Sequence, residues 1–287
     1  MERFYKYSAG RHRKGYRWRP ANSKRNIMTC NPCQFIGKPK LYHYTSIAKA
    51  ISILSTNKLF MGKLSNMNDI NESYRPLSTY IEDGKGFENE DILKDAVQEL
   101  KNYCQTSLST DGVYPGFYIP AMWGHYADKG YGACIVFDKD ALIRKLESKS
   151  DFYYKEVTYR EEKDFNPNIN IRGNPRDYFR ENLYDIFFEK SDCWKCEQEF
   201  RIISNAAKRP VSIDITGCVM AIVMCYAHGD NNHHNSVSGT DDYYRLKSMF
   251  PDYPILEWAN GVCGCCLLDR NGNQWFPQDN STYDVDV

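Results

Sequence analysis

Hydrophobic and polar positions alternate in short blocks along the chain, with a few stretches of helical spacing between them. Residues 41–46 have strand composition, and apolar side chains then repeat at helical spacing as far as Asn57. Ser46 directly precedes this repeat, at the position where a serine side chain caps a helix. Residues 131–137 are almost continuously apolar, as in a central strand. Strands therefore outnumber the helices between them, which predicts an α+β fold.

The remaining elements follow from the same two periods. Apolar residues recur at every second position in the expected strands and at every third or fourth position in the expected helices. Residues 160–176 are polar and rich in Asn and Pro, so we expect a loop there. Further strands are expected at 59–64, 103–109, 152–159, 211–214, 218–226, 254–258 and 262–268, and further helices at 89–103, 121–127, 139–147, 177–190 and 241–250.

The stretch 194–203 combines a strand-like period with charged side chains. Read with period two, it places Glu197, Glu199 and Arg201 on one face and Cys196 on the other, inward face. Two acids on one face cost free energy unless water or a cation relieves their repulsion. This face is therefore expected either to be solvated, with a local ion pair to Arg201, or to hold something cationic.

The composition fits one large domain with an extension. Of the 287 residues, 42% are hydrophobic and 14% aromatic, enough to bury a substantial core. We expect a basic N-terminal arm over residues 1–39 and a single α+β catalytic domain over 40–287. Its motif-bearing core would cover 40–205, and strands and a helix at 206–287 would complete it. The longest apolar run, 218–227, is far too short to cross a bilayer.

Charge is distributed unevenly along a chain whose net charge is zero. Residues 1–40 contain eleven of the 37 basic side chains and one of the 37 acidic ones. Tyr16, Trp18 and other aromatic residues are interleaved with these bases, a mixture that can pair with phosphates and stack on nucleobases. A nucleic-acid or protein partner for the arm is one interpretation. A solvated tail, or one that folds back on the acidic body, is the other.

The cysteines bear on compartment and metal binding. There are eleven, and no apolar segment near the N-terminus resembles a secretory signal, so reduced thiols and a cytoplasmic location without membrane association are expected. Cys30 and Cys33 form a C-x-x-C pair, which is half of a zinc site. The pair Cys193 and Cys196 and the segment 263–266 do not complete a finger-like spacing, so no metal site is expected.

Several polar and aromatic side chains could contribute to a site. Taken singly, each has a structural explanation, because a histidine in a strand is usually hydrogen-bonded within the core and aromatic residues on one helical turn usually pack. Their order along the chain is more informative than any one of them. The candidates are His43, Ser107, Trp123, His125, Tyr126, Glu197 and Glu199.

Five spaced motifs bring these candidates together. They are Leu-Tyr-His43-Tyr-Thr-Ser, Leu64-Ser65 to Asn68-Asp69, Met-Trp123-x-His125-Tyr126-Ala, Gly132-x-Cys-Ile-x-Phe-Asp138 and Trp194-x-x-Glu197-x-Glu199-x-Arg201. In this order they resemble a bacterial family of unknown function, domain of unknown function number 2971, which opens with YHYTS. The resemblance runs from about residue 41 to 204, more weakly to 268, and does not cover the basic arm.

That family is in turn similar to ADP-ribosyltransferases of the His-Tyr-Glu kind. Both have a histidine on the first strand, an aromatic residue on a mid-chain helix and a glutamate on a late strand. The resemblance implies a compact split sheet, mixed or antiparallel, flanked by helices around an ADP-ribosyltransferase-like core. It also implies NAD as the only cofactor, consumed as a substrate.

The resemblance assigns a role to each candidate. His43 would hydrogen-bond a ribose hydroxyl and the nicotinamide side of NAD, and Tyr126, or alternatively Tyr44, would stack on the nicotinamide ring. Glu199 would accept from the ribose 2′-hydroxyl and stabilise an oxocarbenium-like transition state, and Glu197 would orient or deprotonate the acceptor. The other expected cofactor contacts are Thr45, Ser107, Trp123 and Arg201, of which Arg201 either holds the pyrophosphate or neutralises the two acids.

The leading hypothesis is therefore an NAD-dependent ADP-ribosyltransferase or NAD glycohydrolase, in bacterial defence or as a toxin, with nucleic acid as one conceivable acceptor. A non-catalytic module that binds nucleic acid or protein through the arm is the alternative from another class. A hydrolase of glycosidic or phosphodiester bonds that uses Glu197 and Glu199 is a third.

Overall fold

The computed structural model describes residues 38–69, 76–79, 89–112, 115–205, 210–225, 240–258 and 267–268. All of them belong to Pro32–Val287, the larger of the two units into which the chain divides. Most of the expected arm, the Cys30 and Cys33 pair and the segment 263–266 lie outside the described residues. Among the helices of the described ranges, none is both long and apolar enough to cross a membrane.

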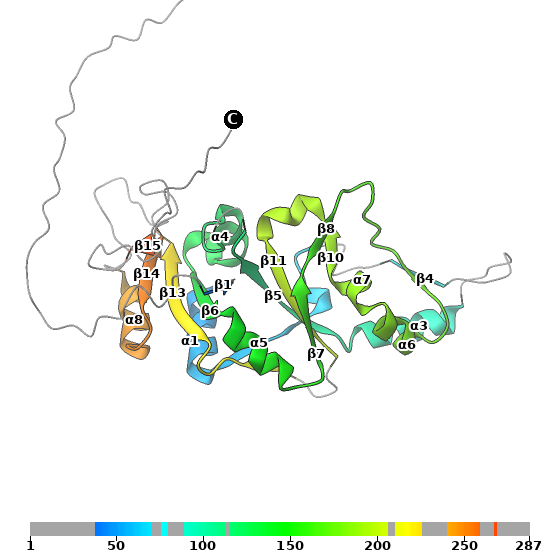
Figure 1. The fold of residues 1–287 in the computed structure, drawn as a ribbon, viewed down its shortest axis with the longest axis horizontal. Coiled ribbons are helices and arrows are strands. Elements are labelled where there is room, and N and C mark those ends of the chain that lie inside the picture. The colour runs from blue at the N-terminus through cyan, green and yellow to red at the C-terminus, as the bar shows by residue number, and fades with distance from the viewer. Residues whose placement is uncertain are drawn as a thin grey trace, which may run out of the picture. The chain divides into compact units, whose positions relative to one another are not determined.

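One mixed sheet organises the described residues (Figure 1). Its strands are antiparallel to their neighbours, except for the parallel pair of 219–225 with 255–258. The expected α+β fold with a mixed, mainly antiparallel sheet is confirmed. In order across the sheet the strands are β15 (Leu267–Leu268), β14 (Ile255–Trp258), β13 (Val219–Cys225), β6 (Ala133–Asp138), β1 (Lys40–Thr45), β5 (Cys104–Thr110), β11 (Glu199–Ser204) and β7 (Phe152–Glu156), and β3 (Gly62–Lys63) also pairs with β5.

Helices cover both faces of this sheet. On one face α1 (Ile47–Thr56), α5 (Lys139–Glu147) and α8 (Asp241–Met249) bury apolar side chains against the strands. On the other face lies α4 (Pro120–Tyr126), which is followed by the short turn η3 (Asp128–Gly130). α1 begins where the sequence predicts, because the Lys49 backbone N–H donates to Ser46 Oγ at 3.4 Å.

A third group of elements packs beside β11 (Figure 1). Phe179 and Phe187 form its core together with Ile203 of β11. The loop expected at 160–176 is confirmed over 161–168 and 172–174, but a short strand interrupts it, in which Ile169 and Ile171 are buried. The helix expected at 177–190 is two helices interrupted at Asn182. The elements are α3 (Glu90–Leu100), α6 (Pro175–Glu181), α7 (Leu183–Phe187), β4 (Leu77–Thr79) and β9 (Ile169–Ile171).

Two other expected strands are each broken by one residue. The strand expected at 59–64 is β2 (Lys58–Phe60), then β3 and the turn η2 (Leu64–Asn66), and β2 pairs with β12 (Ser212–Asp214) instead of joining the main sheet. The strand expected at 152–159 is β7 followed by β8 (Thr158–Arg160), which pairs with β10 (Glu189–Ser191). Period-two patterns do not show such breaks, because the alternation continues across them.

The sheet opens between β1 and β5. These strands pair only at Leu41 with Thr110 and Tyr42 with Ser109. Further along, β3 takes the place beside β5, with Gly62 opposite Gln105. Beyond these two pairs, Tyr44 and Thr45 of β1 have no ladder partner on β5. A wedge-shaped gap between β1 and β5 results, with its narrow end at Tyr42 and Ser109.

Backbone polar groups of Tyr44 and Ser107 face this gap. The Thr110 N–H donates to the Gln198 carbonyl at 2.7 Å, on the β11 side, and the Lys139 N–H donates to the Pro39 carbonyl at 3.0 Å, on the β6 side. In an antiparallel sheet, successive residues direct their N–H and C=O groups to alternate sides. Tyr44 of β1 and Ser107 of β5 therefore direct theirs toward each other across the gap.

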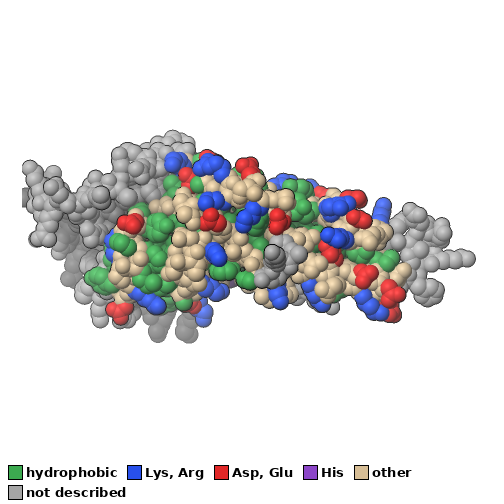
Figure 2. All heavy atoms as spheres, turned by 90° about the horizontal axis from the view of Figure 1, so that it is seen from below, with side chains coloured by type: hydrophobic (Ala, Val, Ile, Leu, Met, Phe, Trp, Pro, Cys, Tyr) green, Lys and Arg blue, Asp and Glu red, His purple; other side chains and the backbone are tan. Residues whose placement is uncertain are grey.

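Charged side chains of both signs share the surface of the described residues. On the face shown in Figure 2, Lys and Arg side chains are interspersed with Asp and Glu side chains. Interspersed charges create no extended field of one sign. The described part of this face therefore does not show the concentrated positive charge that would attract a nucleic-acid backbone.

Candidate active site

Glu197 and Glu199 are brought together by a change of backbone conformation between them. Glu197 ends the 3₁₀ helix η4 (Asp192–Glu197), Gln198 has a left-handed φ of 48°, and Glu199 begins β11. The single strand expected over 194–203 is therefore incorrect. Cys196, which that pattern placed inward, is exposed. Burial of both glutamates, with exposed fractions of 5% and 3%, also excludes the solvated face.

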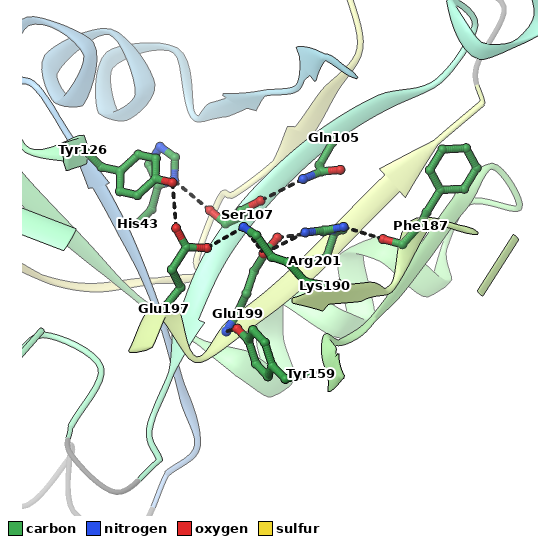
Figure 3. Close-up of polar contacts among 10 residues, drawn as sticks. All are labelled: His43, Gln105, Ser107, Tyr126, Tyr159, Phe187, Lys190, Glu197, Glu199 and Arg201. Atoms are coloured by element: carbon green, nitrogen blue, oxygen red, sulfur yellow. Dashed lines mark hydrogen bonds and ion pairs between the residues drawn. The ribbon is translucent and has the colours of Figure 1, made fainter. Parts of the chain in front are cut away.

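A buried ionic network joins the two carboxylates (Figure 3). Lys190 Nζ donates to Glu197 Oε2 at 2.8 Å and to Glu199 Oε2 at 3.4 Å. The Arg201 guanidinium donates to both oxygens of Glu199, at 2.7 and 2.8 Å, and to the Phe187 carbonyl at 2.6 Å. The sequence pattern predicted a cation beside the two acids as one alternative, and Lys190 and Arg201 are the cations found there.

The two glutamates differ in proton affinity. Burial would raise the pKa of Glu199, but the charge and hydrogen bonds of Arg201, helped by Lys190, lower it to about 2. Burial raises the pKa of Glu197 above its ordinary value, although Lys190 opposes this. Glu199 is therefore held as a carboxylate, whereas Glu197 has the stronger tendency to accept a proton.

Tyr126 and Tyr159 hold the network from two sides. Tyr126, the last residue of α4, donates its hydroxyl proton to Glu197 Oε1 at 2.7 Å. Burial, then the charge and hydrogen bond of Glu197, raise the pKa of Tyr126, so the phenol stays protonated and continues to donate. The Glu199 backbone N–H donates to the Tyr159 hydroxyl oxygen at 2.9 Å. The first contact holds the Glu197 carboxylate, and the second holds the backbone at Glu199.

A cavity of about 570 Å³ lies in the gap between β1 and β5. Consecutive residues of both strands line it, 42–45 of β1 and 105–109 of β5, as expected for a space between two strand edges. Glu197, Glu199 and Lys190 contribute to its wall, together with Tyr126. The ionic network therefore borders a space large enough for a small-molecule ligand.

His43 reaches this cavity from the opposite face of the sheet. Side chains alternate along β1, so His43 shares the α1 face with Leu41, whereas Tyr42 and Tyr44 share the α4 face. His43 Nδ1 donates to the Ser107 carbonyl at 3.4 Å across the gap. Loss of solvation lowers its pKa to about 4. At neutral pH the imidazole is thus uncharged, and Nε2 is an acceptor.

The other expected contacts are divided between the cavity and the core. Thr45, Ser107 and Tyr44 line the cavity, although the Tyr44 hydroxyl donates to the Gly116 carbonyl at 2.6 Å. Trp123 is 2% exposed, does not line the cavity, and stacks on Trp258 with ring centroids 5.5 Å apart. Arg201 is fully buried behind Glu199 and likewise does not line the cavity, and His125 is exposed.

Sequence reasoning missed Lys190, the central cation of the network. Its side chain is 4% exposed and also lies over the Trp194 ring, 4.7 Å from the centroid. Nothing in its local pattern marks it, because it falls at the end of an expected amphipathic helix. The only signal was indirect, since two neighbouring acids in an apolar region require a compensating cation.

The described residues do not bring metal-binding side chains together. No group of three or more His, Cys, Asp or Glu side chains within the described ranges could hold a metal ion. Cys193 and Cys196 are both exposed on η4. The other cysteines considered for a metal site, at 30, 33 and 263–266, fall outside the described ranges.

We expect His43 to make stability depend on pH between about 6.5 and 4. The pKa of His43 is about 4 in the folded protein against 6.5 in the unfolded chain, so the unfolded chain binds more protons in this window. Stability contributed by the neutral imidazole is present above pH 6.5 and is lost as pH falls toward 4, by on the order of 1–3 kcal/mol.

Urea unfolding at pH 7.5, 6, 5 and 4.5 measures this effect. His43→Asn should flatten the pH dependence, and His125→Asn, at an exposed position, should leave it as in the unmodified protein. An unchanged slope in the His43 variant would contradict the assignment of a neutral His43.

The fold and site together define an α+β protein with a buried Tyr-Glu-Lys-Glu-Arg network beside a cavity in a sheet gap. A family model described as "Protein of unknown function (DUF2971)" matches residues 122–202, which contain Tyr126, Lys190 and both glutamates. The family resemblance seen in the sequence is confirmed over these residues. No curated protein and no solved structure matches the chain. The ADP-ribosyltransferase-like core stays a prediction.

Proposed function

We propose that the cavity binds NAD and that the protein cleaves the bond between nicotinamide and ribose. In this reaction the C1–N bond of the nicotinamide ribose breaks, nicotinamide leaves as a neutral molecule, and the ribose carbon acquires oxocarbenium character. Water then attacks to give ADP-ribose and a proton, or an acceptor group takes the ADP-ribosyl unit. Such chemistry is accelerated by a fixed negative charge next to the reacting carbon.

Glu197 is the observation that carries the proposal. Its carboxylate lines the cavity and is held by Tyr126 at 2.7 Å and Lys190 at 2.8 Å. A carboxylate fixed in this way need not reorganise as positive charge develops on the substrate, which is the main source of electrostatic stabilisation in enzymes. Glu199 contacts two cations, Arg201 and Lys190, whereas Glu197 contacts Lys190 and the neutral Tyr126 hydroxyl, so less of its negative charge is offset. We therefore assign the contact with the ribose to Glu197, and assign Glu199 to anchoring Lys190 and Arg201.

The strand edges and His43 supply the groups that a ribose requires. A hydroxyl both donates and accepts, and a strand edge offers N–H and C=O groups side by side. Tyr44 and Ser107 direct such groups into the gap, and neutral His43 adds an acceptor nitrogen. The tyrosine ring of Tyr126 next to Glu197 provides an aromatic surface for nicotinamide.

The acceptor prediction rests on the basic arm. Residues 1–37 lie outside the described residues, so the arm remains a sequence-based argument for nucleic acid or a protein partner. Deleting residues 1–38 should abolish transfer to RNA or DNA, if nucleic acid is the acceptor, without abolishing nicotinamide release. Transfer that persists at the same rate would remove nucleic-acid binding by the arm from the proposal.

Nicotinamide release from NAD by the purified full chain tests the proposed function. We expect release by the unmodified protein, in the presence of RNA, DNA or cell lysate if an acceptor is required, and its loss in Glu197→Gln. Glu189→Gln is a matched control, because Glu189 lies on β10 and pairs with Arg160 at the surface, away from the cavity. No release under any of these conditions, with no NAD binding by calorimetry, would refute the proposal.

A further inference from the structure

The cavity is also lined by an exposed aromatic side chain, which comes from a part of the chain far from the two glutamates in sequence. Phe60 of β2 lines the cavity and is 44% exposed. Its neighbour Leu59 is 1% exposed and belongs to the core. The Phe60 ring is therefore accessible at the cavity, where the ring system of a ligand could stack on it.

A basic side chain also lines the cavity. Lys49 of α1 lines the cavity, and Ser52 and Ile53 follow it on the same helix face at spacings of three and four residues. The Lys49 charge contributes to the low pKa of His43, which places it within electrostatic reach of the gap. The first turn of a helix adds partial positive charge of its own.

We propose that the part of the cavity lined by Phe60 and Lys49 binds the adenosine diphosphate half of a dinucleotide, with adenine stacked on Phe60 and the pyrophosphate at Lys49. The inference deepens the proposed function and in part rests on it. NAD would extend from Tyr126 and Glu197, past the strand edges and His43, to Lys49 and finally Phe60. This order matches the order of groups in the molecule, nicotinamide, ribose, pyrophosphate and adenosine.

The two ends of the proposed NAD site differ in charge, as the two halves of NAD do. At one end the two glutamate charges are offset by Lys190 and Arg201, and the neutral His43 adds none. At the other end Lys49 provides a positive charge for phosphate oxygens, and Phe60 offers a ring face for a base. Stacking on an aromatic ring discriminates little between bases, so ADP and related nucleoside diphosphates are the ligand class.

Calorimetric titration of the full chain with ADP tests the subsite without requiring turnover. Phe60→Ala should weaken ADP binding about tenfold, the factor that 1.4 kcal/mol of lost stacking gives, and Phe60→Tyr should restore it. Binding of inorganic pyrophosphate, which has no base, should be unaffected by Phe60→Ala and weakened by Lys49→Ala. Met249→Ala and Lys94→Ala, at exposed positions outside the cavity lining, are the matched controls.

The possible results separate the subsite from the proposed function. Lack of ADP binding at millimolar concentration, or equal weakening by Phe60→Ala and Met249→Ala, would overturn the subsite. ADP binding that depends on Phe60, without nicotinamide release from NAD, would keep the subsite and refute NAD cleavage. If both hold, Phe60→Ala should raise KM for NAD about tenfold and leave KM for nicotinamide mononucleotide unchanged, because the mononucleotide lacks adenosine.

Discussion

Glu197→Gln is expected to lower the rate of nicotinamide release about 10²–10³-fold, with little change in KM for NAD. The amide keeps the shape of the side chain and its contact with Tyr126, so substrate binding should persist. What disappears is the fixed negative charge that the oxocarbenium-like transition state needs. Steady-state release of nicotinamide by the purified variant, beside the unmodified protein, measures the effect.

Glu199→Gln distinguishes our assignment from the one implied by family resemblance. If Glu199 only anchors Lys190 and Arg201, this variant should lose stability while retaining more activity per folded molecule than Glu197→Gln. If Glu199 faces the ribose, it should be the less active of the two at equal folded fraction. The second outcome would return the catalytic role to Glu199 and leave Glu197 to the acceptor.

Arg201→Met is expected to destabilise the protein by about 3–5 kcal/mol. Arg201 is fully buried and donates to both oxygens of Glu199. Removing the guanidinium leaves the Glu199 carboxylate buried, with the Lys190 contact at 3.4 Å as its remaining ion pair. Most of the cost comes from this carboxylate charge, which the longer Lys190 contact offsets only in part, rather than from lost packing, since methionine retains much of the arginine stem's volume. Urea unfolding of the variant at neutral pH measures the loss.

A second substitution checks the cause of that loss. Adding Glu199→Gln to Arg201→Met removes the unpaired charge, so the double variant should be more stable than Arg201→Met alone. Arg160→Met, which breaks the surface pair with Glu189, is a control expected to shift the unfolding midpoint little. Additive losses at positions 199 and 201 would contradict a direct charge interaction between them.

The sequence predicted local structure best where caps and continuous apolar runs agree. Ser46 and α1, β6 and α5 were all expected within a residue or two. Each of them is specified by neighbours in sequence, because a capping side chain bonds a backbone N–H two or three residues away. The buried faces of these elements then follow from the spacing of their apolar residues.

The sequence failed where long-range contacts decide the backbone. Period two continues through 194–203, but Gln198 is held in a left-handed conformation while its carbonyl accepts from the Thr110 N–H, 88 residues away. No local pattern contains that bond. Lys190 was invisible for the same reason, since its partners Glu197 and Glu199 become neighbours only through this turn.

The sequence predicted which residues belong to the candidate site better than it predicted how they are arranged. Grouping His43, Tyr126, Glu197 and Glu199 relied on motif order, and all four line one cavity. Trp123 and Arg201, also expected to contact a ligand, are buried and do not line this cavity, because side-chain direction depends on which residues the core encloses. Strand alternation alone also could not show that His43 enters from the opposite face, through the gap.

The gap between β1 and β5 narrows toward Tyr42 and Ser109, and strand pairing determines this shape, not the side chains. Each strand is tied along its outer edge, β1 to β6 and β5 to β11, whereas the two strands pair with each other at only two positions. Substituting a lining residue therefore alters which chemical groups are recognised, whereas the thickness of the group that fits is fixed by the main chain. Relatives with the same strand arrangement could thus exchange one substrate for another of equal thickness without remodelling the sheet.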